Sequence, residues 1–264
     1  SALMTSVSGD DNKIETYIAE SRQRDIKLLP PSVNASFSFF SNENGSIRYA
    51  LSSIKKVGAQ TVRVIVEERK TAGKYTDFFD FCRRLPAKVT TQPILEALIL
   101  AGACDEWGKT RTTLLASIEA ALNLAELSRK GDSPVDLFGD LGGGKLALKP
   151  KYTEMEEMPA VDRLTQEKEY LGTYLSEHPL TSYPHQLKQA LTQTIMQVPQ
   201  DKAANFGVYI HRLKETRTKN GELMCFLTVS DASMVISAVA FPNAYRNMKG
   251  KIVENQAVIL NGKV

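Results

Sequence analysis

The stretch LSSIKKVGAQTVRVIVEER at residues 51 to 69 constrains the fold of this chain most strongly. Apolar residues recur at helical spacing on both sides of a tight turn at Val57, Gly58 and Ala59, and Thr61 opens the second helical part. The amides of such a turn and of the following helix start converge on one point, where they can hold a phosphate without reading a base. The stretch therefore predicts two helical segments joined by a phosphate-binding turn.

Charge is segregated along the chain in a way that suits this prediction. Residues 47 to 75 contain seven Lys or Arg and two Glu, although the net charge of the whole chain is only +3, whereas residues 154 to 169 contain six acids and two bases. Alternatively, Gly and Thr only mark helix ends, as in any helix-turn-helix connection. The residues expected to contact duplex phosphates are Lys55, Lys56, Val57, Gly58, Ala59, Thr61 and Arg63.

A less regular copy of the same layout follows. The run PILEALILA at 93 to 101 begins with Pro and is followed by Gly102, and a further helix is predicted over 112–127. Two such units could bury each other's apolar faces and offer two turns to the two strands of a duplex. The candidates in this second hairpin are Gly102, Lys109 and Arg111.

From Phe206 the apolar spacing changes to alternation, which is typical of strands. Strands are expected at 206–211, 223–229, 234–241 and 257–260, with a short helix at 243–248. This order matches a small five-stranded barrel of the oligonucleotide-binding type without its last strand. We expect the open edge to leave residues after about 250 mobile or paired with another chain.

The basic loop predicted at 213–222 joins the first two strands. In this type of barrel, that loop and the second and third strands bind single strands, with aromatic rings stacking on bases. Alternatively, the aromatic residues pack in the core and the cations are solvated surface groups. The candidates for single-strand binding are Tyr209, Lys214, Arg217, Lys219 and Phe226.

The sequence contains no motif that indicates another class of function. Cys82, Cys104 and Cys225 are far apart, so neither a zinc site nor a disulfide framework is expected, and we interpret them as buried small hydrophobic residues. The sequence has no apolar run of membrane-spanning length and no signal-peptide layout, which predicts a cytoplasmic protein. A P-loop, a dinucleotide fingerprint and a catalytic constellation are also absent, so we expect no catalytic residue and no cofactor in this chain.

Six runs of sequence, in this order, resemble one known family: KIETYIAESRQRDIKLLPPSVNAS, IRYALSSIKKVGAQTVRVIVEER, FFDFCRRL, ILEALILAGACDEWG, EKEYLGTYLSEHPL and ELMCFLTVSDASMVISAVAFPNAY. They resemble the alpha subunits of bacterial DNA polymerase III, the C-family of replicative polymerases, from about residue 3 to the end. In one departure, Lys56 stands where that family usually has the first Gly of a Gly-Val-Gly turn.

This resemblance implies a multidomain fold that is mainly α, with a tandem helix-hairpin-helix, followed by a partial all-β barrel. The expected parts are the end of the fingers (1–50), the helix-hairpin-helix DNA-binding domain (51–130), a linker (131–151), a helical connector (152–200) and the truncated barrel (201–264). The hairpins would position the primer-template duplex and the barrel the template single strand. A palm preceding this chain, with magnesium, would act as the DNA-directed DNA polymerase (a nucleotidyltransferase), and this chain alone should be inactive.

The resemblance also implies protein partners, namely the sliding clamp and other replisome subunits. The linker run PVDLFG stands where the family carries a clamp-binding motif, which makes Asp136, Leu137 and Phe138 candidates for clamp binding. Pro134 replaces the Gln that starts this motif in the family. Alternatively, the run packs locally on the helical domain.

Two other functions compete with a polymerase segment. A non-catalytic scaffold for branched-DNA binding or repair can combine the same two folds. An RNA-processing or tRNA-binding module is disfavoured, because the hairpin geometry suits duplex phosphates rather than splayed bases.

Overall fold

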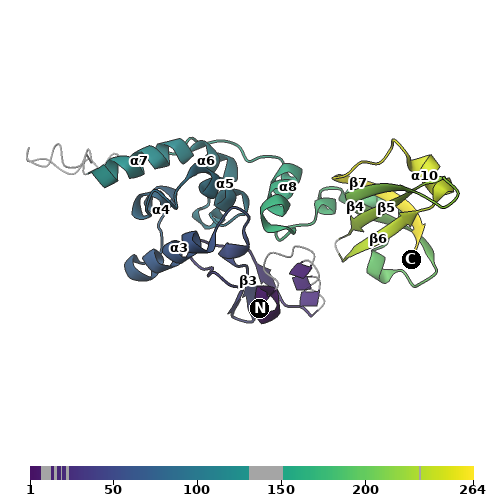
Figure 1. Cartoon of the computed structure of the whole chain (residues 1–264), viewed down its shortest axis with the longest axis horizontal. Helices are drawn as coiled ribbons and strands as arrows, with labels where there is room; N and C mark the ends of the chain where they lie inside the picture. Colours follow the sequence, from purple (N-terminus) through teal and green to yellow (C-terminus); the bar gives the residue numbers. More distant parts are fainter. Residues whose placement is uncertain (7–12, 15–16, 19, 22–23, 131–150, 232) are drawn as a thin grey trace, which may run out of the picture. The chain divides into compact units, whose positions relative to one another are not determined.

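The computed structural model describes residues 1–6, 13–14, 17–18, 20–21, 24–130, 151–231 and 233–264. The chain forms two compact units, Ser1–Ser176 and Glu177–Val264. The boundary between them lies within the helical connector predicted over 152–200, and the finer division into five parts stays a prediction. The helical first unit and the strand-rich second unit confirm the predicted fold class (Figure 1).

A short helix and a small sheet begin the first unit. Helix α1 spans Ala2–Ser6, and strands β1 (Leu28–Leu29), β2 (Ser41–Glu43) and β3 (Ser46–Arg48) pair in the order β1-β3-β2. Asn44 and Gly45 join β2 to β3 with φ angles of 51° and 82°, the left-handed backbone that a two-residue hairpin turn needs. An Asn-Gly pair is a strong local signal for such a hairpin, and the hairpin forms here.

The remaining helices of the first unit are α3 (Ala59–Ala72), α4 (Phe78–Arg84), α5 (Gln92–Leu100), α6 (Arg111–Ala116), α7 (Ile118–Lys130) and α8 (Ala160–Leu171). Pro93 lies in the first turn of α5, as predicted. The single helix predicted over 112–127 is instead two helices, α6 and α7. They part at Ser117, whose hydroxyl donates to the Thr113 carbonyl and accepts from the Thr153 amide.

The first part of the predicted hairpin is shorter than expected. Only a 3₁₀ turn forms, at Leu51–Ser53, and Ile54 is extended. The Lys55 amide donates to the Tyr170 carbonyl at 2.9 Å and so does not continue a helix from Leu51. The second helix starts two residues before Thr61, at Ala59.

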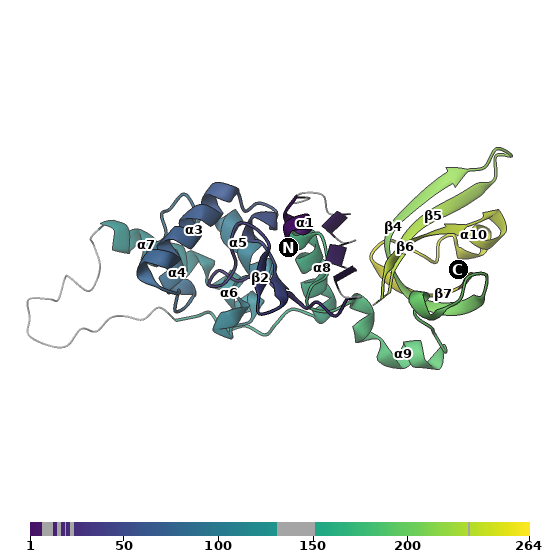
Figure 2. The same cartoon turned by 90° about the horizontal axis from the view of Figure 1, so that it is seen from below.

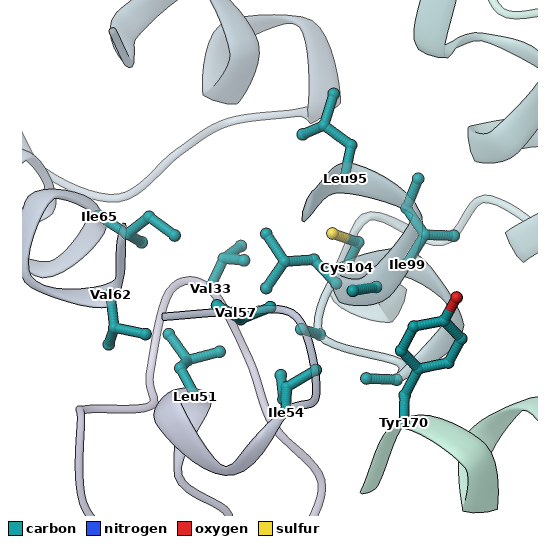
Figure 3. Close-up of a cluster of buried hydrophobic side chains, with 14 of the residues drawn as sticks. Val33, Leu51, Ile54, Val57, Val62, Ile65, Leu95, Ile99, Cys104 and Tyr170 are labelled. Atoms are coloured by element: carbon teal, nitrogen blue, oxygen red, sulfur yellow. The ribbon is translucent and has the colours of Figure 1, made fainter. Parts of the chain in front are cut away.

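Apolar residues of the turn anchor it in the core of this unit. Leu51, Ile54 and Val57 point into a cluster with residues of α3 and α5 and with Tyr170 of α8 (Figure 3). Cys82 and Cys104 are buried in the same core, and burial raises the pKa of Cys82 to about 12. Together with buried Cys225, this confirms their interpretation as small hydrophobic residues.

The second unit contains a sheet of four antiparallel strands, β4 (Ala203–Arg217), β5 (Leu223–Ser230), β6 (Val235–Ala240) and β7 (Gln256–Lys263), in the order β6-β5-β4-β7. Helix α10 (Pro242–Met248) lies against β5 and β6 (Figure 2). Before the sheet come a 3₁₀ turn at Pro179–Ser182, α9 (Pro184–Gln189) and a 3₁₀ turn at Ile195–Gln197. Among the described residues the sheet does not close, which is consistent with a partial barrel of the oligonucleotide-binding type.

Two strand predictions were wrong in extent. Strand β4 continues to Arg217, so the loop predicted at 213–222 reduces to residues 218 to 222. Strand β7 pairs with β4 from Ala203↔Lys263 to Ile210↔Gln256. Residues 256–263 therefore have a partner strand within the chain, contrary to expectation.

Among the described residues, no helix combines the length and apolar character that crossing a membrane requires.

Candidate nucleic-acid interface

The first hairpin, residues 51 to 61, presents an uncapped helix start. Gly58 precedes α3 with an extended backbone, and no side chain in the described part of the chain caps it. The first intrahelical bond runs from the Val62 amide to the Gly58 carbonyl at 3.1 Å. The three amides before it, those of Ala59, Gln60 and Thr61, therefore have no acceptor within the helix. Gly58 and the first two residues of α3 are exposed, so solvent and ligands reach this helix start.

Among the described residues of the first unit, nothing requires glycine at position 58. Its φ of −72° suits any residue, and a Cβ built there would meet no atom within 4 Å. Because glycine has no side chain, a ligand can approach the amides at the start of α3 without steric hindrance. This is the property that close contact with a phosphate oxygen requires.

Helix α8 holds the first hairpin through its last residues. The Lys55 amide donates to the Tyr170 carbonyl, and the Tyr49 hydroxyl donates to the Leu171 carbonyl at 2.7 Å. The Lys56 ammonium lies 5.1 Å from the centre of the Tyr170 ring and 3.3 Å from its hydroxyl. Lys56 has a φ of 68°, the left-handed conformation that favours glycine. Both lysine side chains are exposed.

The other predicted residues of the first hairpin differ in what they present. Val57 and Thr61 are buried, so their side chains face the core and only their backbone is near the helix start. Arg63 is exposed, and its Nε donates to Glu67 at 2.8 Å one turn along α3. An exposed pair of this kind is weak, which leaves the guanidinium able to turn to a phosphate.

The second hairpin, residues 101 to 112, uses its arginine internally, so the predicted phosphate contact from Arg111 is corrected. The Arg111 side chain is buried and binds both carboxylate oxygens of Asp105, at 3.1 and 2.7 Å. It also donates to the Leu100 carbonyl at 2.9 Å. Gly102 has a φ of 80°, and a Cβ there would lie 2.4 Å from the Arg111 guanidinium. Gly102 therefore makes room for this arginine.

A carboxylate from the acidic segment already occupies the start of α6. Glu157 accepts hydrogen bonds from the Arg111 amide at 3.0 Å and the Thr112 hydroxyl at 3.1 Å, and Lys109 pairs with Glu154 at 2.5 Å. Burial raises the pKa of Glu157, but the hydrogen bonds from Arg111, Met158 and Thr112 outweigh it, and the pKa is lowered. The two hairpins thus differ in their free donors, because the carboxylate of Glu157 occupies the helix start of the second hairpin, whereas no described side chain caps that of the first.

The single-strand candidates of the second unit lie on different parts of the sheet. Lys214 is directly opposite Phe226 on β5, and Phe226 is opposite Val239 on β6. Phe226 is 44% exposed, so its ring is available for stacking, and Lys219 is exposed in the turn after β4. Arg217 follows Lys214 by three residues and therefore projects from the other face.

The stacking prediction for Tyr209 was wrong. Its side chain is only 2% exposed and lies beside the His211 ring. Tyr209 is opposite Ser230, whose hydroxyl is hydrogen-bonded to the rings of His178 and His211 at 2.7 and 2.6 Å. The clamp candidates Asp136, Leu137 and Phe138 lie outside the described residues.

Comparison with known proteins shows what this chain is similar to. Residues 25–114 match a family model described as a helix-hairpin-helix motif. The chain is 43% identical over 263 residues to the DNA polymerase III subunit alpha of Bacillus subtilis (strain 168), a match that covers 99% of this chain and 23% of that protein. The predicted resemblance to the DNA polymerase III alpha subunit is confirmed.

A second alpha subunit gives the same picture. That of Staphylococcus aureus (strain MRSA252) is 38% identical over 261 residues, which cover 99% of this chain and 24% of that protein. The chain thus spans about a quarter of the length of the alpha subunits it matches.

Sequence reasoning missed the residues that complete the two hairpins. Tyr170 lies in the EKEYLG run that resembles the alpha subunit, but no local pattern shows that it supports a turn 114 residues away. Glu157 belongs to the acidic segment at residues 154 to 169, whose composition alone does not indicate a contact with the start of α6. Asp105 is an opposite charge six residues before Arg111, and this pairing was the one available signal. Among the described residues, no three His, Cys, Asp or Glu side chains are grouped to hold a metal ion.

Proposed function

We propose that this chain is a DNA-binding segment of a replicative polymerase alpha subunit and that its first hairpin holds primer-template duplex by the phosphates. The exposed, uncapped start of α3 at Gly58 carries this proposal. It combines amide donors, the positive end of a 14-residue helix, and the cations Lys55 and Lys56. No base-reading group is involved, so binding would depend on salt and not on sequence.

The second unit would bind the template single strand on the sheet face that carries Lys214 and Phe226. These two side chains are directly opposite each other on neighbouring strands, which puts a cation beside an exposed ring. A base stacked on Phe226 would place its phosphate within reach of the Lys214 ammonium.

Catalysis would belong to the complete alpha subunit, as a DNA-directed DNA polymerase with its carboxylates and magnesium in a palm that precedes this segment. By itself the chain would position DNA without extending it. The Asp136-Leu137-Phe138 run would bind the sliding clamp through its two apolar side chains, and other replisome subunits would be further partners. Replacing Leu137 and Phe138 with Ala should weaken binding to an immobilised clamp, and unchanged affinity would reject this part.

The duplex proposal is tested by fluorescence anisotropy with a labelled primer-template over a salt series. Gly58→Val adds a branched side chain at the helix start, where a Cβ meets no neighbour, so the fold should be unaffected. We expect affinity to fall about tenfold or more, the equivalent of one or two lost charge-assisted hydrogen bonds. Lys70→Gln, an exposed cation at the far end of α3, is the matched control and should have a small effect. Equal affinities for wild type and Gly58→Val, or binding that does not weaken as salt rises, would reject the proposal.

A further inference from the structure

A pocket of about 290 Å³ lies where the β4–β5 hairpin meets α10 in the second unit. Arg217 at the end of β4 and Arg246 and Lys249 at the end of α10 bring three cations to its wall. The pocket is on the opposite side of the sheet from Lys214 and Phe226. Arg217 is opposite Leu223, two residues along from the pair of Glu215 with buried Cys225, so it shares the face against which α10 packs.

The carboxylates near this pocket hold its cations only loosely. Glu222 lies 3.8 Å from Arg246, and Glu215 lies 3.9 Å from Lys249, in pairs whose side chains are all more than 40% exposed. Such separations are too long for hydrogen bonds, and exposed pairs of this kind are weak. Glu215 also accepts a hydrogen bond from the Tyr245 hydroxyl, which occupies part of its acceptor capacity. Arg217 donates one hydrogen bond, to the Gly221 carbonyl at 2.9 Å. A guanidinium has five N–H donors.

Besides the three cations, Glu222 and Gly221 line the pocket, and the rest of its wall is largely apolar. Leu223 and Pro242 are half-buried, and Tyr245 is buried, with its ring against the core of the unit. The volume is near the lower end of the range for small-ligand pockets, about 300 to 1,000 Å³. A bare phosphate ion would leave much of this space and the apolar wall uncontacted.

We propose that this pocket binds one phosphorylated nucleoside unit, with the phosphate on Arg217, Arg246 and Lys249 and the nucleoside against Leu223 and Pro242. Guanidinium groups bind phosphate oxygens in a bidentate manner, and the ammonium adds a further charge. The unit is either a free nucleotide or one residue of a DNA strand. If the unit is one residue of a DNA strand, the inference rests on the proposed function, because the same strand would have to be bound by the second unit.

The test is titration of the full chain with thymidine 5′-monophosphate, thymidine, inorganic phosphate and oligothymidylate, followed by NMR chemical shifts and calorimetry. We expect saturable binding of the nucleotide, at least about tenfold tighter than that of thymidine or of phosphate. The double variant Arg246→Gln/Lys249→Gln should lose at least about tenfold in nucleotide affinity. Lys202→Gln, an exposed cation just before the start of β4 and so at the end of that strand away from Arg217, should leave nucleotide affinity unchanged. Circular dichroism of each variant checks that the sheet is intact.

The oligonucleotide separates the two sources of the ligand and the two proposals. If the double variant weakens oligothymidylate and nucleotide alike, the pocket takes a unit of the strand. If only the nucleotide is affected, the pocket takes the free ligand. If wild type binds no nucleotide, or binds phosphate equally well, the pocket inference is overturned. Oligonucleotide binding that is lost in Lys214→Gln or Phe226→Ala would still support the proposed function in that case.

Discussion

Replacing Arg111 with Met should destabilise the first unit without lowering its affinity for DNA. The guanidinium binds Asp105, the Leu100 carbonyl and, at 3.6 Å, the buried carboxylate of Glu167. Removing one partner of a buried ion pair costs about 3 to 5 kcal/mol. Two details favour the lower figure. The Asp105 side chain is 47% exposed and can be rehydrated, and Glu167 keeps hydrogen bonds from the amides of Leu175 and Ser176.

We therefore expect a loss of about 3 kcal/mol in the free energy of unfolding. For a unit of this size each kcal/mol shifts Tm by roughly 2 to 4 °C, so Tm should fall by about 6 to 12 °C. Differential scanning calorimetry of the full chain measures this shift. Arg63→Met is the matched control, because it removes the same charge from an exposed pair on α3 and should leave Tm almost unchanged.

The effects of the two variants on DNA affinity should be the reverse of their effects on Tm. Below its own Tm, Arg111→Met should bind primer-template like wild type, whereas Arg63→Met should bind more weakly. If Arg111→Met keeps the wild-type Tm but binds DNA more weakly, the internal role of Arg111 is refuted and its original interpretation as a phosphate contact is restored.

Three further outcomes follow from the structure. Because the folded-state pKa of Glu157 is lowered, its contribution to stability is present at neutral pH and is lost as the pH falls below the ordinary value of 4.5. Glu157→Gln should thus have a lower Tm than wild type at neutral pH and a smaller loss of Tm on acidification, and parallel Tm–pH curves would contradict this. Tyr209→Ala should cost about 3 kcal/mol in urea unfolding of the second unit, since it empties a buried site. Phe226→Ala should change the free energy of unfolding by less than about 1 kcal/mol, because the ring is exposed, and it should weaken oligothymidylate binding. A large loss of stability with unchanged oligothymidylate binding would place Phe226 in the core.

Local chemistry made some elements predictable. Asn44-Gly45 can adopt the left-handed backbone of a hairpin turn, and within a helix Pro93 is tolerated only in the first turn, so local sequence indicates both elements. The alternation after Phe206 likewise fixed the number and order of the strands in the second unit.

The rest depended on partners distant in sequence. Arg111 is a cation after a helix-ending glycine, as a phosphate ligand would be, and only the packing around Asp105 and Leu100 shows that it is buried. Glu157 reaches the start of α6 from 46 residues away. Strand β7 was expected to lack a partner within the chain, but it pairs with β4, and the paired residues lie more than forty positions apart in the sequence, a separation that no local pattern bridges.

The support that α8 gives to the first hairpin bears on the order of folding. The contacts of Tyr170 and Leu171 with Lys55, Lys56 and Tyr49 close a loop of more than a hundred residues, and contacts of such high sequence separation form late and slowly. The amides of the turn reach their final position only when nearly the whole first unit has been synthesised and folded. A fragment that stops at residue 114, where the helix-hairpin-helix match ends, contains every residue of the phosphate-binding turn and lacks the helix that holds it in place.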